Sequence, residues 1–188
     1  MSAGASSLRV IHVGLGQIGV RLARATASRR GLRSAAGVDP NPALQGSTLA
    51  ALCGAGDGEA AVYPRLADAL VAVGRCDVAF HAVGSELAAI DGQLQELLEA
   101  KLNVVTTAEE LIHPAERAPV IAARLDAVAK RNGVTLFAAG INPGFLMDRL
   151  PAYVTSVCTC VESIEVRRLV DLGARRPALR RKMGVGET

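Results

Sequence analysis

The sequence is poor in aromatic residues and has no long apolar run. Phenylalanine, tyrosine and tryptophan make up 3% of its 188 residues, and tryptophan is absent, although 50% of the residues are hydrophobic. The core must therefore be built from Ala, Val, Leu and Ile, which suits parallel strands covered by helices. No apolar run reaches the roughly 18 residues of a membrane span, so we expect no membrane segment. Residues 1–7 lack an apolar signal core, which favours a cytoplasmic protein.

Signals for metal and nucleic-acid binding are equally weak. The four cysteines form no C-x-x-C pair and no nearby histidine completes a zinc site, so we expect no metal and mostly buried, reduced thiols. The net charge is only +3. Much of the basic excess lies late in the chain, in Arg167, Arg168, Arg175, Arg176, Arg180, Arg181 and Lys182. No aromatic interleaving or binding motif accompanies this cluster, so we predict no nucleic-acid partner.

A glycine turn between a strand and a helix is the most informative stretch of the chain. The apolar run LRVIHV (8–13) leads into GLGQIG, and a helix-patterned segment follows. Gly14 permits a tight turn, Gly16 lets the backbone approach a pyrophosphate, and Gly19 lets the helix pack against the strand. This context separates the pattern from a plain glycine-rich turn and predicts dinucleotide binding.

Asp39 ends a second apolar run, 20 positions after the third glycine. Its carboxylate is placed to accept hydrogen bonds from an adenosine ribose, whereas a 2′-phosphate would meet a like charge, costing roughly 4 kcal/mol at about 4 Å. We predict NAD or NADP as cofactor, with NAD favoured, although Arg9 could offset the charge. The N–H groups of Gln17 and Ile18 are expected to face the phosphates. The alternative for Asp39 is a turn carboxylate before Pro40.

Six strands alternating with helices are predicted, which makes an α/β fold with a doubly wound parallel sheet of the Rossmann type. The strands are expected at residues 8–13, 33–38, 60–63, 77–83, 103–107 and 134–139. The helices are expected at residues 17–30, 43–52, 65–73, 87–100 and 115–131.

The pattern changes after residue 146. A helix over 147–157, broken near Pro151, precedes a strand-like segment at 163–170. One strand cannot form a stable sheet alone, so we expect the chain to be cut within a second domain. The prediction is a Rossmann domain over 1–146, followed at 147–188 by the beginning of an α+β substrate and dimerisation domain.

Several loops are expected at the carboxyl ends of the strands, where open α/β sheets bind ligands. The predicted cofactor contacts in these loops are Ala82, Val83, Gly84, Ser85, Thr106 and Asn142. The turn that contains Asn142 has the interdomain hinge as its alternative, and a loop can serve both purposes.

Glu109 and Glu110 are the candidate acid/base residues, because they follow a strand at the same edge. A carboxylate there can take a proton from a substrate amine, and at most one of the two is expected to do so. The alternative is a pair of exposed acids at a helix start. His113 lies close enough in sequence to assist, whereas His81 and His12 are expected to be structural core histidines.

The segments GLGQIG, HAVGSEL, NVVTTAEELIHP, GINPGFLMD and VDLGARRPALRRKMGVG resemble the dihydrodipicolinate-reductase-like family, on the side of 2,4-diaminopentanoate dehydrogenase and native amine dehydrogenases. The resemblance implies an NAD(P)-dependent oxidoreductase that acts on a C–N bond of a small amine or diamine. It also implies a catalytic glutamate within TTAEEL, and a homodimer when full length.

One departure from the family bears on the substrate. Dihydrodipicolinate reductases carry a His-His and Lys segment and a Ser-Gly-Thr loop, and this sequence has neither the His-His pair nor that loop. Because these segments are absent, an imine reductase of that type is only the alternative function. A second alternative is a truncated nucleotide-binding module without turnover.

Overall fold

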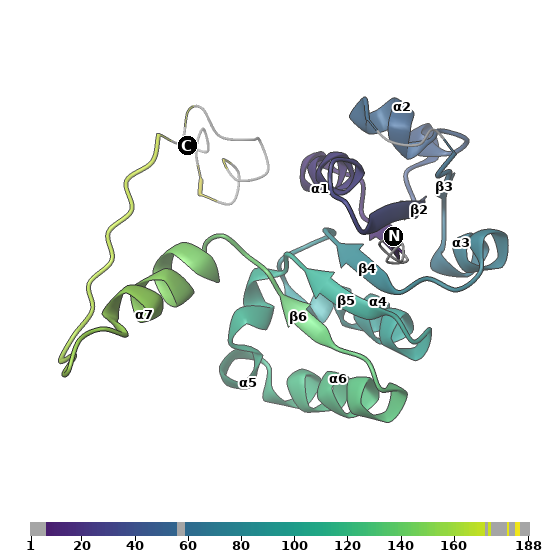
Figure 1. The fold of residues 1–188 in the computed structure, drawn as a ribbon. Coiled ribbons are helices and arrows are strands. Elements are labelled where there is room, and N and C mark those ends of the chain that lie inside the picture. The colour runs from purple at the N-terminus through teal and green to yellow at the C-terminus, as the bar shows by residue number, and fades with distance from the viewer. Residues whose placement is uncertain (1–6, 56–58, 172, 174–179, 181–182, 185–188) are drawn as a thin grey trace, which may run out of the picture. The chain divides into compact units, whose positions relative to one another are not determined.

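The short apolar runs of the sequence form one parallel sheet in a computed structural model, which describes residues 7–55, 59–171, 173, 180, 183 and 184. The strands are β1 (Leu8–Val13), β2 (Leu32–Val38), β3 (Val62–Tyr63), β4 (Val78–His81), β5 (Asn103–Thr106) and β6 (Leu136–Ala138). Their order is β3-β2-β1-β4-β5-β6, and every neighbouring pair is parallel (Figure 1). This confirms the predicted doubly wound Rossmann sheet.

Helices cover both faces of the sheet and create two separate cores. The helices are α1 (Gln17–Ala27), α2 (Leu49–Cys53), α3 (Leu66–Val73), α4 (Leu87–Glu99), α5 (Pro114–Arg117) and α6 (Pro119–Asn132). Helices α1 and α2 lie on one side of the sheet, and α3, α4 and α6 lie on the other (Figure 1). The smaller core, under α1 and α2, contains Leu15, Ala23, Leu49, Cys53 and Val62. The larger core is built from leucines of α4 and from small strand residues, as the low aromatic content requires.

The element boundaries differ from the predictions mainly near proline and at strand ends. The helix predicted over 115–131 is divided at Ala118 (φ −146°, ψ 66°), because Pro119 disfavours the helical conformation of the preceding residue. Helix α1 ends at Ala27 rather than at residue 30. The helix predicted over 43–52 consists of a 3₁₀ turn, Pro42–Leu44, followed by α2. Strand β6 is shorter than predicted.

The chain divides into two compact units, Met1–Asp148 and Arg149–Thr188. A π-helical turn, Phe145–Arg149, spans the division, and α7 (Leu150–Thr155) follows it. Pro151 stands in the first turn of α7, where no intrahelical N–H bond is lost, so it does not break the helix. The strand predicted at 163–170 is wrong, since these residues pair with no strand among those described. Most of the basic cluster, Arg175, Arg176, Arg181 and Lys182, lies outside the described residues.

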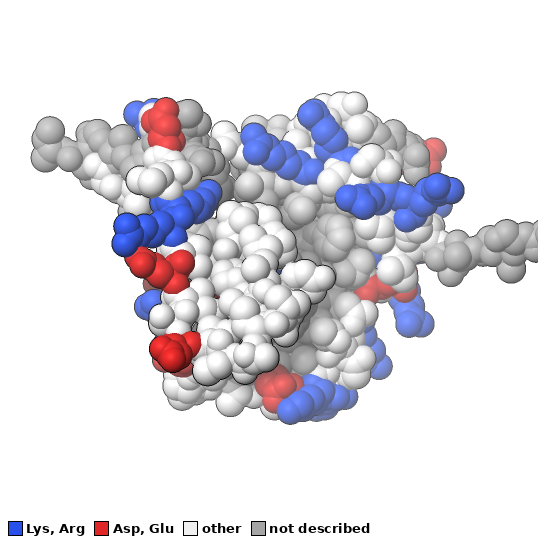
Figure 2. Space-filling view, turned by 60° about the vertical axis from the view of Figure 1, so that its left-hand side comes forward, with Lys and Arg blue, Asp and Glu red and all other residues white. Residues whose placement is uncertain are grey.

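The four cysteines divide into a buried and an exposed pair. Cys53 and Cys76 are buried as expected, but Cys158 and Cys160 are exposed, which corrects the prediction for that pair. Within the described part of the chain, no cluster of three or more His, Cys, Asp or Glu could hold a metal ion, and no helix has the length and hydropathy of a membrane span. Figure 2 shows one face with a broad area free of charged side chains, bordered by charges of both signs.

Candidate functional site

The carboxyl ends of the strands are aligned in one row, so the loops that follow them start at the same edge. Val13 lies opposite both Val38 and His81, His81 lies opposite Thr106, and Thr106 lies opposite Ala138. Backbone hydrogen bonds join the start of each loop to the neighbouring strand: Gly14 N to Val38 O (2.9 Å), Ala82 N to Val13 O (2.8 Å), Thr107 N to His81 O (3.0 Å) and Ala139 N to Thr106 O (2.8 Å). The predicted site segments therefore converge, as the parallel topology requires.

The three glycines of the turn differ in what a side chain would meet. Gly14 has φ +82°, and a Cβ there would lie 2.8 Å from the carbonyl oxygen of Ala82. A Cβ on Gly19 would collide with the carbonyl oxygen of Gly14. A Cβ on Gly16 would meet no described atom within 4 Å. The packing of the fold therefore requires glycine at Gly14 and Gly19. At Gly16 the packing would tolerate a side chain, and the glycine leaves the exposed backbone there uncovered.

The start of α1 borders a groove of about 430 Å³, lined by Leu15, Gly16, Gln17, Val20, Arg21 and Arg24. Gly16 is the N-cap of α1 and provides no side-chain hydrogen bond to the helix. The first N–H groups of an α-helix have no partner within the helix, so those of α1 remain for an anion. Arg24 is held by a hydrogen bond from its Nε to Cys53 O (2.6 Å).

Asp39 is held against the glycine turn by its carboxylate. The N–H of Leu15 donates to Oδ2 (2.7 Å), and the N–H of Asn41 donates to Oδ1 (2.9 Å). The second bond is the turn role that the sequence left open for this residue. The first bond places the carboxylate beside the turn, and each oxygen retains lone-pair capacity for a further donor.

The two candidate glutamates begin a 3₁₀ turn, Glu109–Ile112, after β5, and both side chains are partly buried. The N–H of Leu87, the first residue of α4, donates to Glu110 Oε2 (2.7 Å). Glu110 therefore accepts a hydrogen bond from one N–H that has no partner within the helix, and its charge lies at the positive end of α4. The N–H of Glu110 also lies 3.5 Å from Ser85 O, which joins the loop after β5 to the loop after β4.

Two histidines lie inside the sheet. His81 is fully buried, and its ring nitrogens contact Thr106 Oγ1 (2.9 Å) and Gln93 Oε1 (2.9 Å). Burial lowers the pKa of His81 below its usual value, against the opposing effect of the Gln93 hydrogen bond. His12 contacts Ser34 Oγ through Nε2 (3.0 Å), and burial lowers its pKa to about 4. Both are neutral core groups at pH 7, in agreement with the structural interpretation.

The loop after β6 is tightly folded. The Asn142–Pro143 peptide bond is cis, and Gly144 has φ +124°, with the position of its missing Cβ only 2.5 Å from Gly140 O. The N–H of Gly144 donates to Asp148 Oδ2 (2.6 Å), and His113 Nε2 lies 3.6 Å from Asp148 Oδ1. His113 thus contacts the loop after β6 through Asp148, a residue that the sequence analysis missed.

Gln93 was missed as well, although the sequence contains a signal for it. Buried residues of α4 follow the helical period at Leu87, Ile90, Leu94 and Leu97. Position 93 falls three residues after Ile90 and four before Leu97, so a glutamine there interrupts the apolar stripe. A polar side chain on a buried stripe needs a partner, and His81 is that partner.

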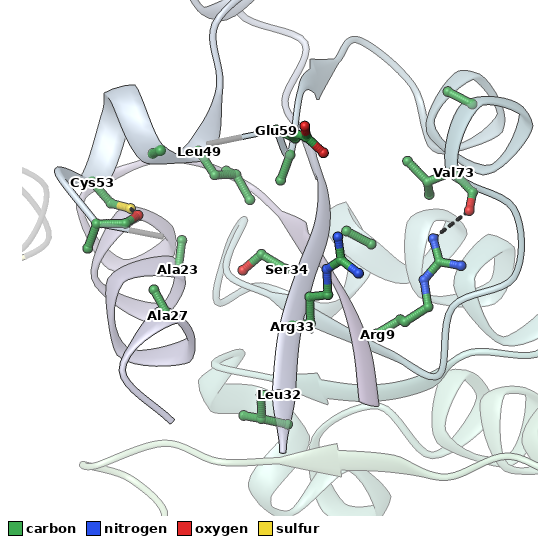
Figure 3. Close-up of a pocket in the computed structure, with 15 residues that line it drawn as sticks. Arg9, Ala23, Ala27, Leu32, Arg33, Ser34, Leu49, Cys53, Glu59 and Val73 are labelled. Carbon is green, nitrogen blue, oxygen red and sulfur yellow. Dashed lines mark hydrogen bonds between the residues drawn. The ribbon is translucent and has the colours of Figure 1, made fainter. Parts of the chain in front are cut away.

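A second hollow, of about 440 Å³, lies away from this edge. Figure 3 shows that it surrounds the amino-terminal half of β2, with Ala23 and Cys53 on one side and Arg9 and Val73 on the other. Arg9 Nη2 donates to Val73 O (2.5 Å) on one side of it (Figure 3). Because ligands of open α/β sheets bind at the carboxyl ends of the strands, this hollow is not the candidate site.

Comparisons with known proteins agree with the fold. No protein-family model matches the chain. The chain is 38% identical to 2,4-diaminopentanoate dehydrogenase of Acetoanaerobium sticklandii over 96 residues, which are 51% of this chain and 27% of that protein. The structure of an amine dehydrogenase from Mycobacterium smegmatis matches 81% of this chain and 45% of its own, with TM-score 0.71 and 28% identity. The WlbA dehydrogenase from Bordetella pertussis, solved with NADH and UDP-GlcNAcA, matches 73% of this chain and 36% of its own, with TM-score 0.54 and 24% identity.

The fold defines the class, which is a Rossmann domain, and the proteins that it resembles are dehydrogenases. Within that class the chain resembles 2,4-diaminopentanoate dehydrogenase and amine dehydrogenase, as the sequence segments predict. These relatives are dehydrogenases, in agreement with the predicted oxidoreductase class. The chain spans about a quarter of the curated relative and less than half of the solved amine dehydrogenase.

Proposed function

We propose that the chain forms the cofactor-binding part of an NAD(P)-dependent oxidoreductase that acts on the C–N bond of a small amine or diamine. The supporting observation is the contact of Glu110 with Leu87, because it brings an acidic loop against the loop after β4, at the edge that contains the glycine turn. The likenesses to 2,4-diaminopentanoate dehydrogenase and amine dehydrogenase support the choice of a C–N bond. An imine reductase of the dihydrodipicolinate type has no comparable support.

The residues of the glycine turn fit a dinucleotide. Gly16 is exposed, and the first N–H groups of α1 have no partner within the helix, which suits a pyrophosphate. Asp39 is placed for the ribose hydroxyls, and its negative charge favours NAD over NADP. Ala82, Val83, Gly84, Ser85 and Asn142 are proposed to complete the cofactor contacts, whereas Thr106, also predicted as a contact, is fully buried and contacts His81 instead. A bound nicotinamide supplies the hydride acceptor for amine oxidation and the hydride donor in the reverse direction.

Glu109 is the proposed acid/base, and Glu110 is the residue that positions the loop. Glu110 already accepts the Leu87 N–H, so its carboxylate is committed to the start of α4. During oxidation Glu109 would accept a proton from the substrate ammonium while the C–N bond becomes a C=N bond. The lone pair that this leaves on the nitrogen forms the C=N bond as the hydride passes to the nicotinamide. In reductive amination the same carboxyl group returns the proton.

Two matched substitutions separate the glutamates. Glu109→Gln should lower turnover about 10²- to 10⁴-fold, because an amide cannot accept the proton, while NADH binding remains intact. Glu110→Gln should change turnover only about threefold, because an amide oxygen still accepts the Leu87 N–H. Steady-state amine oxidation and NADH calorimetry provide the measurements. A large loss for Glu110→Gln alone would reverse the two roles, and no loss for either would remove proton transfer from both.

The second candidate is a nucleotide-binding module without turnover. It is supported by the partial match to the amine dehydrogenase, of which this chain covers 45%. Calorimetry with NADH beside an amine-oxidation assay distinguishes the two. Binding without turnover supports the module, and absence of binding contradicts both candidates. A homodimer is proposed on the family resemblance alone.

A further inference from the structure

A row of four hydrogen-bonded polar groups begins at Ala108, the residue before the candidate glutamates, and three of the four are buried. The N–H of Ala108 donates to Thr106 Oγ1 (3.1 Å), and Thr106 Oγ1 contacts His81 Nδ1 (2.9 Å). His81 Nε2 contacts Gln93 Oε1 (2.9 Å). Ala108, Thr106 and His81 are each 0% exposed. The row therefore joins the loop after β5 to β4 and to α4.

Donor and acceptor chemistry assigns one direction to this row. A glutamine Oε1 only accepts, so His81 must present a proton on Nε2 and a lone pair on Nδ1 in its neutral form. Thr106 then donates its single hydroxyl proton to Nδ1 and accepts the Ala108 N–H. If the Gln93 amide were turned over, its NH2 group would donate to Nε2, and His81 would carry its proton on Nδ1. Thr106 Oγ1 would then accept from both Nδ1 and the Ala108 N–H, and its own proton would have no acceptor in the row. The direction from Ala108 to Gln93 satisfies each of these donors.

The row is one of two connections between α4 and the residues on either side of Glu109. Ala108 is the residue before Glu109 and the N-cap of its 3₁₀ turn. At the other end, Gln93 belongs to α4, and the first N–H of α4 is bound by Glu110. The segment Ala108–Glu110 is therefore attached to α4 on both sides of Glu109, once through the Thr106–His81–Gln93 row and once through the Glu110 carboxylate.

We propose that Thr106 and His81 are positioning residues for the proton-transfer step, holding the Ala108 N–H and thereby the direction in which Glu109 points. This inference rests on the proposed role of Glu109. The two residues touch neither substrate nor reacting atoms in this role, because both are fully buried. Their effect is on the geometry of the acid/base, so it should appear in the rate of the chemical step rather than in substrate or cofactor affinity.

The first test compares two substitutions of Thr106 in the full chain. Thr106→Val keeps the shape but removes both hydrogen bonds and leaves the buried Ala108 N–H without a partner. We expect kcat for amine oxidation to fall about 10- to 100-fold, with KM and the NADH dissociation constant changing less than about threefold. Thr106→Ser retains the hydroxyl and should restore kcat to within about threefold of wild type. An unchanged kcat in Thr106→Val, or an equal loss in Thr106→Ser, would overturn the proposal.

The second test needs no turnover. Nitrogen-15 NMR of the wild-type chain should find His81 protonated on Nε2 and bare on Nδ1, and a proton on Nδ1 would overturn the assignment. Exchange of the Ala108 amide proton should be slow in wild type and about 10- to 100-fold faster in Thr106→Val. Equal exchange in the two chains would also overturn it. If wild-type protein binds NADH but oxidises no amine, the proposed function fails, and these two measurements still decide whether the row holds Ala108.

Discussion

The sheet-forming unit and the segment after Asp148 are built from similar residues but differ in what those residues contact. In the first unit, Val10 and Ile11 of β1 are 0% exposed, because strands lie on both sides and helices on both faces. In the second, Val157 is 87% exposed and Leu169 is 97% exposed. Among residues 149–171 none is buried. The comparison teaches that branched apolar residues form a strand only where a neighbouring strand accepts their backbone hydrogen bonds.

Leucine truncations in the two units should give the largest contrast. Leu97 is 0% exposed in the core under α4, so Leu97→Ala should lower the free energy of unfolding by about 2–5 kcal/mol. Leu169→Ala, at an exposed position, should change it by less than about 0.5 kcal/mol. Urea unfolding followed by circular dichroism measures both. Equal losses would show that Leu169 is covered in solution.

The glycine turn offers a contrast within the first unit. Gly19→Ala places a Cβ against the Gly14 carbonyl and should cost about 1–3 kcal/mol of stability, or more, because backbone must move. Gly16→Ala should leave the unfolding free energy within about 0.5 kcal/mol of wild type, since the site is open, yet weaken NADH binding in calorimetry. Unchanged NADH affinity in Gly16→Ala would show that the pyrophosphate does not bind at this turn.

Acid should weaken the first unit through its buried histidines. The pKa of His12 is lowered from 6.5 to about 4 by burial, so the unfolded chain binds a proton that the folded chain refuses between these values. Stability is therefore complete above about pH 6.5 and falls toward pH 4, by roughly 1.4 kcal/mol per pH unit for one such group. His12→Asn should flatten this slope in urea titrations between pH 4 and 7. An unchanged slope would assign the loss to other groups.

Much of the site could be predicted because its signals are local. Gly14 needs a positive φ and Gly19 needs a missing Cβ, and both needs are visible in the pattern of strand, turn and helix. Asp39 could be found by its distance along the chain from the turn. The contact of Glu110 could not be found in this way, because its partner Leu87 lies 23 residues earlier in the chain.

The sequence by itself determined the six strands and their alternation with helices, because period and glycine position act over a few residues. Tertiary structure alone decided that 163–170 is not a strand, that Glu110 caps α4, and that Gln93 meets His81. Each of these depends on which elements become neighbours in the sheet order β3-β2-β1-β4-β5-β6. A local pattern specifies what a segment can form, and its partners in space decide whether it does.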